Sequence, residues 1–213
     1  MSESELLQQI ALKDSDKEKI ADRVIGKPDL LPVIFEGLNN DQPRIKYGCD
    51  KVLRIISEKA PETLYPKFDF FTGQLDSETT FHKWGAIHII ANLTAVDTKN
   101  KFERIFERYF APISGPVLIT AGNIIGGAAK IVLSKPHLTE KITNELLKVE
   151  KAEYQTTECR NIALGHTIKS VDQFFDQIED TEPIITLIKK QLKNTRNATR
   201  KKAEQFVKKR LDH

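Results

Sequence analysis

Basic side chains recur at one position of a repeated pattern in this 213-residue chain. Lys46, Lys83, Arg160 and Arg200 each stand three residues before a small residue, respectively Cys49, Ala86, Ala163 and Ala203. A line of Lys and Arg on one surface binds phosphate groups, because each cation neutralises one anionic oxygen cluster. The pattern therefore raises the possibility of an anion-binding surface.

Aromatic side chains follow two of these bases, Tyr47 and Trp84. Equivalent positions of a repeat protein stack into a ridge, so the pair predicts an aromatic surface open to a side chain or a base of a partner. The alternative is a place in the core between repeats, which we favour because large aromatics are usually well buried. Ala121 and Asn161 interrupt any such ridge in the third and fourth copies.

Positive charge gathers at the C-terminal end. Residues 189–213 hold ten Lys or Arg and two acids, whereas residues 1–188 carry a net charge of −5. The end repeat of an array needs a polar outer face, but capping does not explain why the charge is positive. We expect Arg200, Lys201 and Lys202 to attract an anionic partner: nucleic acid, an acidic protein or a membrane surface.

Catalytic signatures are missing. The chain has no nucleophile elbow, zinc-protease helix, P-loop or dinucleotide fingerprint, and its five histidines are scattered, so we expect no enzyme activity, metal or cofactor. Gly122, Gly126 and Gly127 form a glycine-rich run, but without the Lys-Ser/Thr of a phosphate loop. We interpret them as small residues that let one helix pack close to its neighbours.

Helices must position these residues. The copies recur at spacings of 37, 37, 40 and 40, each within an amphipathic helix. A second apolar run precedes each copy across a short polar turn, at residues 30–38, 64–75, 102–110, 138–147 and 184–192. The expected fold is all-α, an α-α superhelix of about five helix pairs over residues 29–213. Residues 1–28 should form an N-terminal helical cap, with helices at 3–12 and 15–24, the second starting from a Ser15–Glu18 capping box.

The unit of roughly 40 residues resembles the HEAT-repeat family, through Leu30-Leu31-Pro32 and the basic-x-x-small pattern, over residues 29–211. A tetratricopeptide array fits less well because its period is shorter. The HEAT resemblance implies that the repeated base lies beside an acidic or amide residue of the turn within its repeat, forming a structural ladder, and Asp41 and Asp76 are suitably placed partners. We favour this ladder over a phosphate-binding line.

The resemblance implies a non-enzymatic scaffold for protein–protein interaction. The alternative is nucleic-acid binding, since some alkylpurine DNA glycosylases are HEAT-like solenoids. The likeness to them is architectural only, and one Trp and an acidic body disfavour it. HEAT subunits that act on pigment-protein complexes form a third class without specific support.

The remaining expectations concern location. Cys49 and Cys159 should be buried, reduced thiols, because neither has a cysteine neighbour. The acidic start Met1–Glu5 lacks the basic region of a signal peptide, and no apolar run is long enough to span a bilayer. We therefore expect a cytoplasmic protein.

Overall fold

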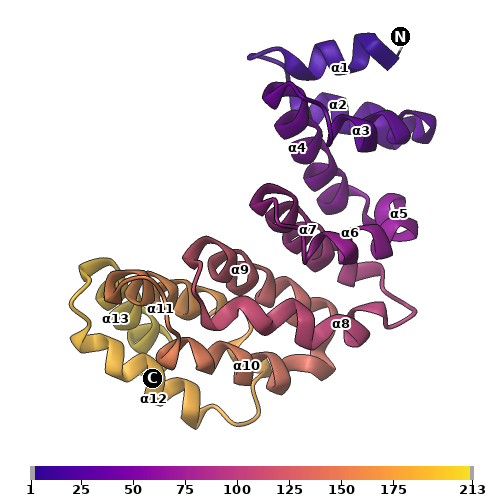
Figure 1. Ribbon diagram of the computed structural model, residues 1–213. Helices are drawn as coiled ribbons and strands as arrows, with labels where there is room; N and C mark the ends of the chain where they lie inside the picture. Colours follow the sequence, from indigo (N-terminus) through magenta and orange to yellow (C-terminus); the bar gives the residue numbers. More distant parts are fainter. Residues whose placement is uncertain (1–2, 212–213) are drawn as a thin grey trace.

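The computed structural model describes residues 3–211, and every regular element in that range is helical (Figure 1). The two N-terminal helices are α1 (Glu3–Ala11) and α2 (Lys17–Gly26). The α-helices that follow are α3 (Leu31–Gly37), α4 (Pro43–Lys59), α5 (Pro61–Leu64), α6 (Phe68–Gln74), α7 (Thr80–Leu93), α8 (Lys101–Phe110), α9 (Leu118–Ser134), α10 (Thr139–Leu147), α11 (Thr157–Val171), α12 (Glu182–Lys190) and α13 (Asn197–Arg210). This confirms the all-α expectation.

Helices α3–α13 form five successive pairs within the described residues. The first member of each pair lies on the outer side of a curved array, and we call these the outer helices: α3, α5 with α6, α8, α10 and α12 (Figure 1). The second members line the inner side, and we call these the inner helices: α4, α7, α9, α11 and α13. Consecutive inner helices pack on one another, which confirms an α-α superhelix.

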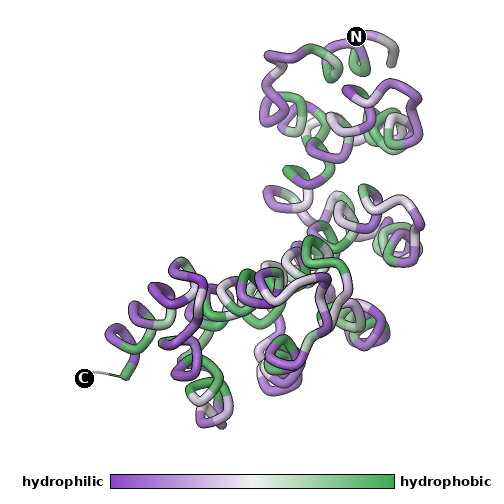
Figure 2. Tube along the Cα trace, turned by 60° about the vertical axis from the view of Figure 1, so that its left-hand side comes forward, coloured by the Kyte–Doolittle hydropathy of each residue, from purple (hydrophilic) through white to green (hydrophobic). Residues whose placement is uncertain are grey.

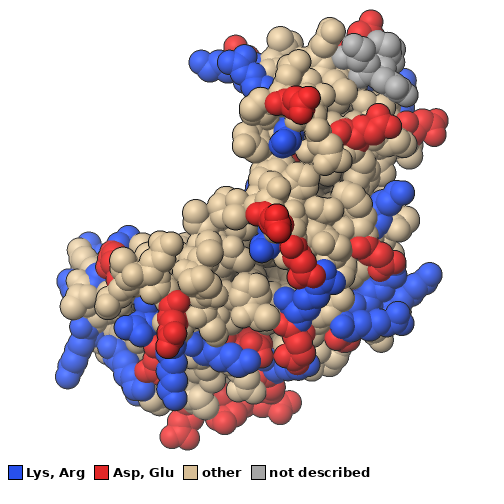
Figure 3. Space-filling view, in the orientation of Figure 1, with Lys and Arg blue, Asp and Glu red and all other residues tan. Residues whose placement is uncertain are grey.

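Apolar stripes explain why the pairs close. In α8 the side chains of Phe102, Phe106, Tyr109 and Phe110 recur at helical spacing and are all buried. Each such side chain contributes roughly 1.5–3 kcal/mol by leaving water. Similar stripes meet between the helices along the whole array (Figure 2), giving one continuous core. The array bends into two arms around a hollow, whose visible wall is mostly uncharged (Figure 3).

The N-terminal helices α1 and α2 both pack on α4. Their division from the repeats as a cap, residues 1–28, stays a prediction. The start of α2 differs from the expected capping box: Asp16, not Ser15, is the N-cap and accepts hydrogen bonds from the N–H groups of Glu18 and Lys19. A carboxylate satisfies these free N–H groups as well as a hydroxyl and also interacts favourably with the helix dipole.

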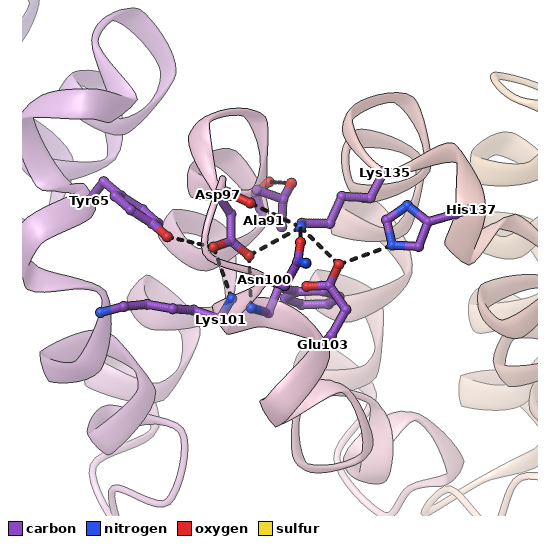
Figure 4. A network of polar contacts seen from close by, with 10 residues as sticks. Tyr65, Ala91, Asp97, Asn100, Lys101, Glu103, Lys135 and His137 are labelled. Carbon is purple, nitrogen blue, oxygen red and sulfur yellow. Dashed lines mark hydrogen bonds and ion pairs between the residues drawn. The ribbon is translucent and has the colours of Figure 1, made fainter.

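A buried polar network joins three successive pairs at their outer edge (Figure 4). Asp97 accepts hydrogen bonds from Tyr65 Oη at 2.6 Å and from two backbone N–H groups at the start of α8. Lys135, only 5% exposed, lies 3.2 Å from the carboxylate of Asp97 and 2.9 Å from that of Glu103. Desolvation would raise the pKa of Asp97, but these donors outweigh it and lower the pKa. The network fixes the relative positions of the repeats.

Ion pairs between repeats have a fixed polarity. Wherever two described side chains pair across more than one helical turn, the acid comes first in the chain and the base belongs to a later repeat. Asp76 thus pairs with Arg108 rather than Lys83, and neither Lys46 nor Lys83 forms an ion pair within residues 3–211. The expected pairing of Lys46 and Lys83 with Asp41 and Asp76 is therefore not found among the described residues, whereas Arg200 does bond to an amide residue of its own turn, Asn197.

The same polarity accounts for part of the basic C-terminal end. Lys190, Arg196, Lys209 and Arg210 neutralise acids of earlier repeats: Glu150, Glu158, Asp172 and Asp176. Half of the excess charge therefore has a structural origin.

Both cysteines are free thiols. Cys49 is buried, and desolvation raises its pKa to about 12, so it is inert. Cys159 is only half-buried, which corrects the expectation for that residue: it stands in the first turn of α11, where the hydroxyl of the N-cap Thr156 donates to its sulfur.

Candidate interaction surface

The inner helices leave one face free. Each packs on an outer helix and on the neighbouring inner helices, so its remaining exposed stripe points into the hollow. On α4 this stripe is Tyr47, Lys51, Arg54 and Glu58, at spacings of four, three and four. We call the sum of these stripes the inner face.

The stripe of α9 is the least explained by packing. It consists of Ile119, Gly122, Gly126, Lys130 and Leu133. Ile119 and Leu133 are 54% and 55% exposed, although exposed aliphatic side chains gain nothing from folding. A Cβ added at Gly122 or Gly126 would meet no neighbouring atom within 4 Å. Glycine in a helix interior costs up to about 1 kcal/mol relative to Ala, and here no close packing requires it.

The expected packing role therefore holds for one glycine of the run. A Cβ at Gly127 would come within 2.6 Å of Tyr109 Oη and 3.1 Å of Ala91 Cβ. Gly127 faces the core, whereas Gly122 and Gly126 leave bare backbone on the inner face. The interpretation of all three as packing residues is wrong for these two.

Aromatic side chains line the start of the inner helices. Tyr47 is 55% exposed, and its ring lies 4.7 Å from that of Phe81 on α7. Trp84 is half-buried, packs against the core and donates from Nε1 to Thr120 Oγ1 of α9 at 3.0 Å. The two aromatics thus differ: Tyr47 offers an open ring, while Trp84 mainly joins α7 to α9.

A cavity of about 390 Å³ lies at the other end of the inner face. Its lining includes Glu58, Pro61, Asn92, Ala95, Lys130 and Leu133. Lys130 bonds to two other residues of the lining, because its Nζ lies 2.8 Å from Glu58 Oε1 and 2.7 Å from Asn92 Oδ1. The positive charge of Lys130 is therefore neutralised, and Leu133 joins Pro61 and Ala95 as an apolar part of the lining.

Two titratable side chains lie between these ends. Burial, assisted by the nearby charges of Arg54 and Lys130, lowers the pKa of His88 to about 4, so His88 is neutral at pH 7. Burial raises the pKa of Asp50 to about 6, and its nearest base, Arg54, is 4.0 Å away. A Cβ at Gly85 would overlap with Asp50 Oδ1, so α7 covers this carboxylate directly.

The predicted basic residues fall into different surroundings. Arg200 donates to Asn194 O and Asn197 Oδ1, both at 3.0 Å, and so holds the turn before α13. Lys201 is exposed and Lys202 is half-buried. Lys83 is half-buried beside the stripe of α7, and Arg160 borders a cavity formed by residues 152–157 at the start of α11. The structure does not bring the seven predicted residues into one site.

Sequence reasoning missed Ile119, Leu133, His166 and Lys169. The available signal was α9 itself: within residues 118–134 its one charged residue is Lys130, so the helix is apolar on the side that faces the hollow. No group of three or more His, Cys, Asp or Glu placed to hold a metal occurs among residues 3–211. In the same range, no helix combines the length and apolarity needed to cross a bilayer.

Comparison with known proteins supports the fold alone. No protein-family model and no curated protein matches the chain. A designed armadillo repeat protein superposes with a TM-score of 0.55 at 15% sequence identity, covering 97% of this chain and 92% of that one. An engineered protein known from a crystal structure gives a TM-score of 0.53 at 12% identity, covering 98% and 96%. The chain therefore has an armadillo-like α-solenoid fold.

Proposed function

We propose that this chain is a non-enzymatic scaffold of the HEAT type whose inner face binds a polypeptide segment of a partner protein. The observation that carries the proposal is the stripe of α9, where exposed Ile119 and Leu133 flank the bare backbone of Gly122 and Gly126. Helix propensity and packing both favour larger residues at these glycines, so a requirement other than folding accounts for them.

The arrangement suits a segment with apolar anchors. Anchors of this kind supply most of the affinity of a protein interface, and they need pockets or open backbone to approach. Leu133 beside the 390 Å³ cavity offers such a pocket, and Tyr47 offers a ring about which a second anchor can pack. The free thiols Cys49 and Cys159 fit a reducing compartment such as the cytoplasm.

Nucleic-acid binding receives less support from the inner face. A duplex binder presents many unpaired bases along its groove. Here Lys130 is paired with Glu58, and His88 is neutral at pH 7 because its pKa is lowered to about 4. The stripe of α9, whose one charged side chain is paired, fits a polypeptide better than a phosphate backbone.

Substitution at an open glycine tests the proposal without disturbing the core. Gly126→Arg adds a long side chain to the inner face, and Gly73→Arg is its matched control, because a Cβ at Gly73 on the outer helix α6 also meets no atom within 4 Å. The chain is immobilised, exposed to extract of its own cells, and its bound proteins are quantified by mass spectrometry.

We expect a protein that the unaltered chain and Gly73→Arg retain equally and that Gly126→Arg loses by about tenfold or more, the effect of removing one central contact worth over 1 kcal/mol. Circular dichroism should show equal helicity in all three proteins. Equal retention by Gly126→Arg would contradict the proposal.

A further inference from the structure

Two lysines face each other across the groove between α11 and α13 without an acid between them. The groove has a volume of about 240 Å³ and is lined by Ile168, Lys169, Asp172, Lys202, Gln205, Phe206 and Lys209. Lys202 Nζ lies 3.4 Å from the position of a Cβ on Gly165, so the missing side chain lets this lysine lean over α11. Neither Lys169 nor Lys202 has an ion-pair partner within residues 3–211.

The acid in the groove is already neutralised. Asp172 accepts from Lys209 Nζ at 2.9 and 3.0 Å and from Arg210 Nε at 2.9 Å. Arg196, nearby, pairs with Glu158. Lys169 and Lys202 therefore give the groove a positive charge that no acid among residues 3–211 compensates.

The equivalent groove between α7 and α9 is different. There Lys130 meets Glu58, a carboxylate of an earlier inner helix, as the polarity of the ion pairs requires. In the α11–α13 groove the carboxylate at the end of α11, Asp172, pairs with Lys209 and Arg210, and the residues of α11 next to Lys202 are His166 and Lys169. Burial lowers the pKa of Lys202, and Lys169 and Arg196 lower it further, which reflects the missing counter-charge.

We infer that the groove between α11 and α13 binds an oxyanion, with Lys169 and Lys202 as its cations and Gln205 as an amide donor at its rim. This deepens the proposed function, since the oxyanion would be a carboxylate or phosphate on the partner segment whose apolar residues occupy the centre of the inner face. Charge-assisted hydrogen bonds from the two lysines would make the α11–α13 groove select partner segments that carry a negative charge at this position.

His166 reports on the groove. Burial lowers its pKa, and Lys202, Lys169 and Arg196 lower it further. An anion between the lysines would offset their effect, so the pKa of His166 should rise when inorganic phosphate is added. NMR titration of the His166 ring protons against pH, with and without phosphate, measures this directly.

Lys169→Met with Lys202→Met removes the cations, and Lys208→Met is the control, because Lys208 is an exposed base elsewhere on α13 and forms no ion pair with residues 3–211. We expect phosphate to raise the pKa of His166 in the unaltered chain and in Lys208→Met. In the double variant the pKa should start higher and no longer respond. Phosphate affinity should fall by more than about tenfold, because two charge-assisted hydrogen bonds are lost. An equal response in all variants, or none in the unaltered chain, would overturn the inference.

A hexa-aspartate peptide, a phosphoserine peptide and a thymidine oligonucleotide then distinguish the sources of the oxyanion. We expect either peptide to displace phosphate, with a salt dependence no steeper than two ionic contacts. The contradicting result is an oligonucleotide that binds more tightly than both peptides. Its slope of log K against log salt would also be steeper than about −0.7 for each of two contacts. That result would identify the ligand of the groove as nucleic acid and overturn the protein source. The phosphate titration needs no partner protein. A failed titration with successful capture would therefore overturn the oxyanion site alone, and a successful titration with failed capture would overturn the proposed function of the inner face alone.

Discussion

Buried carboxylates at the outer edge of the array and near its inner face have pKa values shifted in opposite directions. At the outer edge, Asp97 is surrounded by donors from three repeats, and these lower its pKa although desolvation acts against them. On the inner side, Asp50 lies under Gly85 with its nearest base 4.0 Å away, and burial raises its pKa to about 6. The carboxylate of Asp97 is thus compensated by several donors, whereas that of Asp50 has one distant base. Compensation at the outer edge is not complete, because Glu103 Oε2 is buried without a hydrogen-bond partner among the described residues.

This difference distinguishes residues that stabilise the fold from residues that we propose bind a partner. Lysines and acids between repeats have partners inside the chain, so they explain how the solenoid keeps its curvature. Open glycines, exposed aliphatic side chains and the lysine pair of the last groove have none among residues 3–211, so we infer that they are available to a partner. Each prediction below tests one side of the contrast.

The largest effect is expected at Lys135. Lys135→Met leaves the carboxylates of Asp97 and Glu103 buried without their cation, which should lower the free energy of unfolding by about 3–5 kcal/mol. Lys190→Met is the control, because its pair with Glu150 is exposed, and it should cost less than about 1 kcal/mol. Urea unfolding followed by circular dichroism measures both. Similar losses in the two variants would mean that the outer network has no special role.

An intermediate effect is expected at Asp50, as a dependence on pH. Its pKa in the folded chain is raised to about 6 from 3.8, so an unfolded chain ionises it first and the folded state is penalised as the pH rises between these values. Asp50→Asn removes that penalty. Relative to the unaltered chain, the variant should gain about 2–3 kcal/mol of unfolding free energy between pH 4 and pH 7.

Urea unfolding at several pH values checks this, and the difference between the two proteins cancels the contribution of His88. A difference that stays constant with pH would show that Asp50 is as well compensated as Asp97, and the contrast between the two regions would fail.

The smallest effects, of opposite sign, are expected at two adjacent glycines. Gly126→Ala should stabilise the chain by about 0.5–1 kcal/mol, since the added methyl meets only open space and improves helix propensity. Gly127→Ala should destabilise it by about 1–3 kcal/mol, because the methyl would crowd Tyr109 and Ala91. Thermal unfolding of both variants decides the sign. Destabilisation by Gly126→Ala would place that residue in the packing of the fold.

Sequence periodicity predicts the helix pairs because the spacing of apolar residues within each amphipathic helix marks the side that is buried. The recurring small residues Cys49, Ala86, Ala163 and Ala203 are all deeply buried, as their spacing predicts. Local signals also place helix starts to within about two residues, and Asp16 in place of Ser15 is a one-residue choice between two good caps.

What the sequence could not predict depends on contacts between repeats. Pairing Asp76 with Arg108 requires knowing which edge of one pair faces the next, and a repeat pattern alone does not state this direction. The glycines of α9 look alike in sequence, yet a rotation of 100° separates Gly126 from Gly127 and sends one to the hollow and the other to the core. The lysine pair of the last groove is likewise assembled from two repeats.

Site-specific photocrosslinking tests the central claim, that the inner face is the binding surface, most directly. A benzophenone side chain replaces Ile119 on the inner helix α9 or, as control, Arg104 on the outer helix α8, both of which are exposed. After irradiation in the native cells, the account predicts a discrete crosslinked protein from position 119 and none from position 104. A discrete adduct at position 104 with none at position 119 would contradict it.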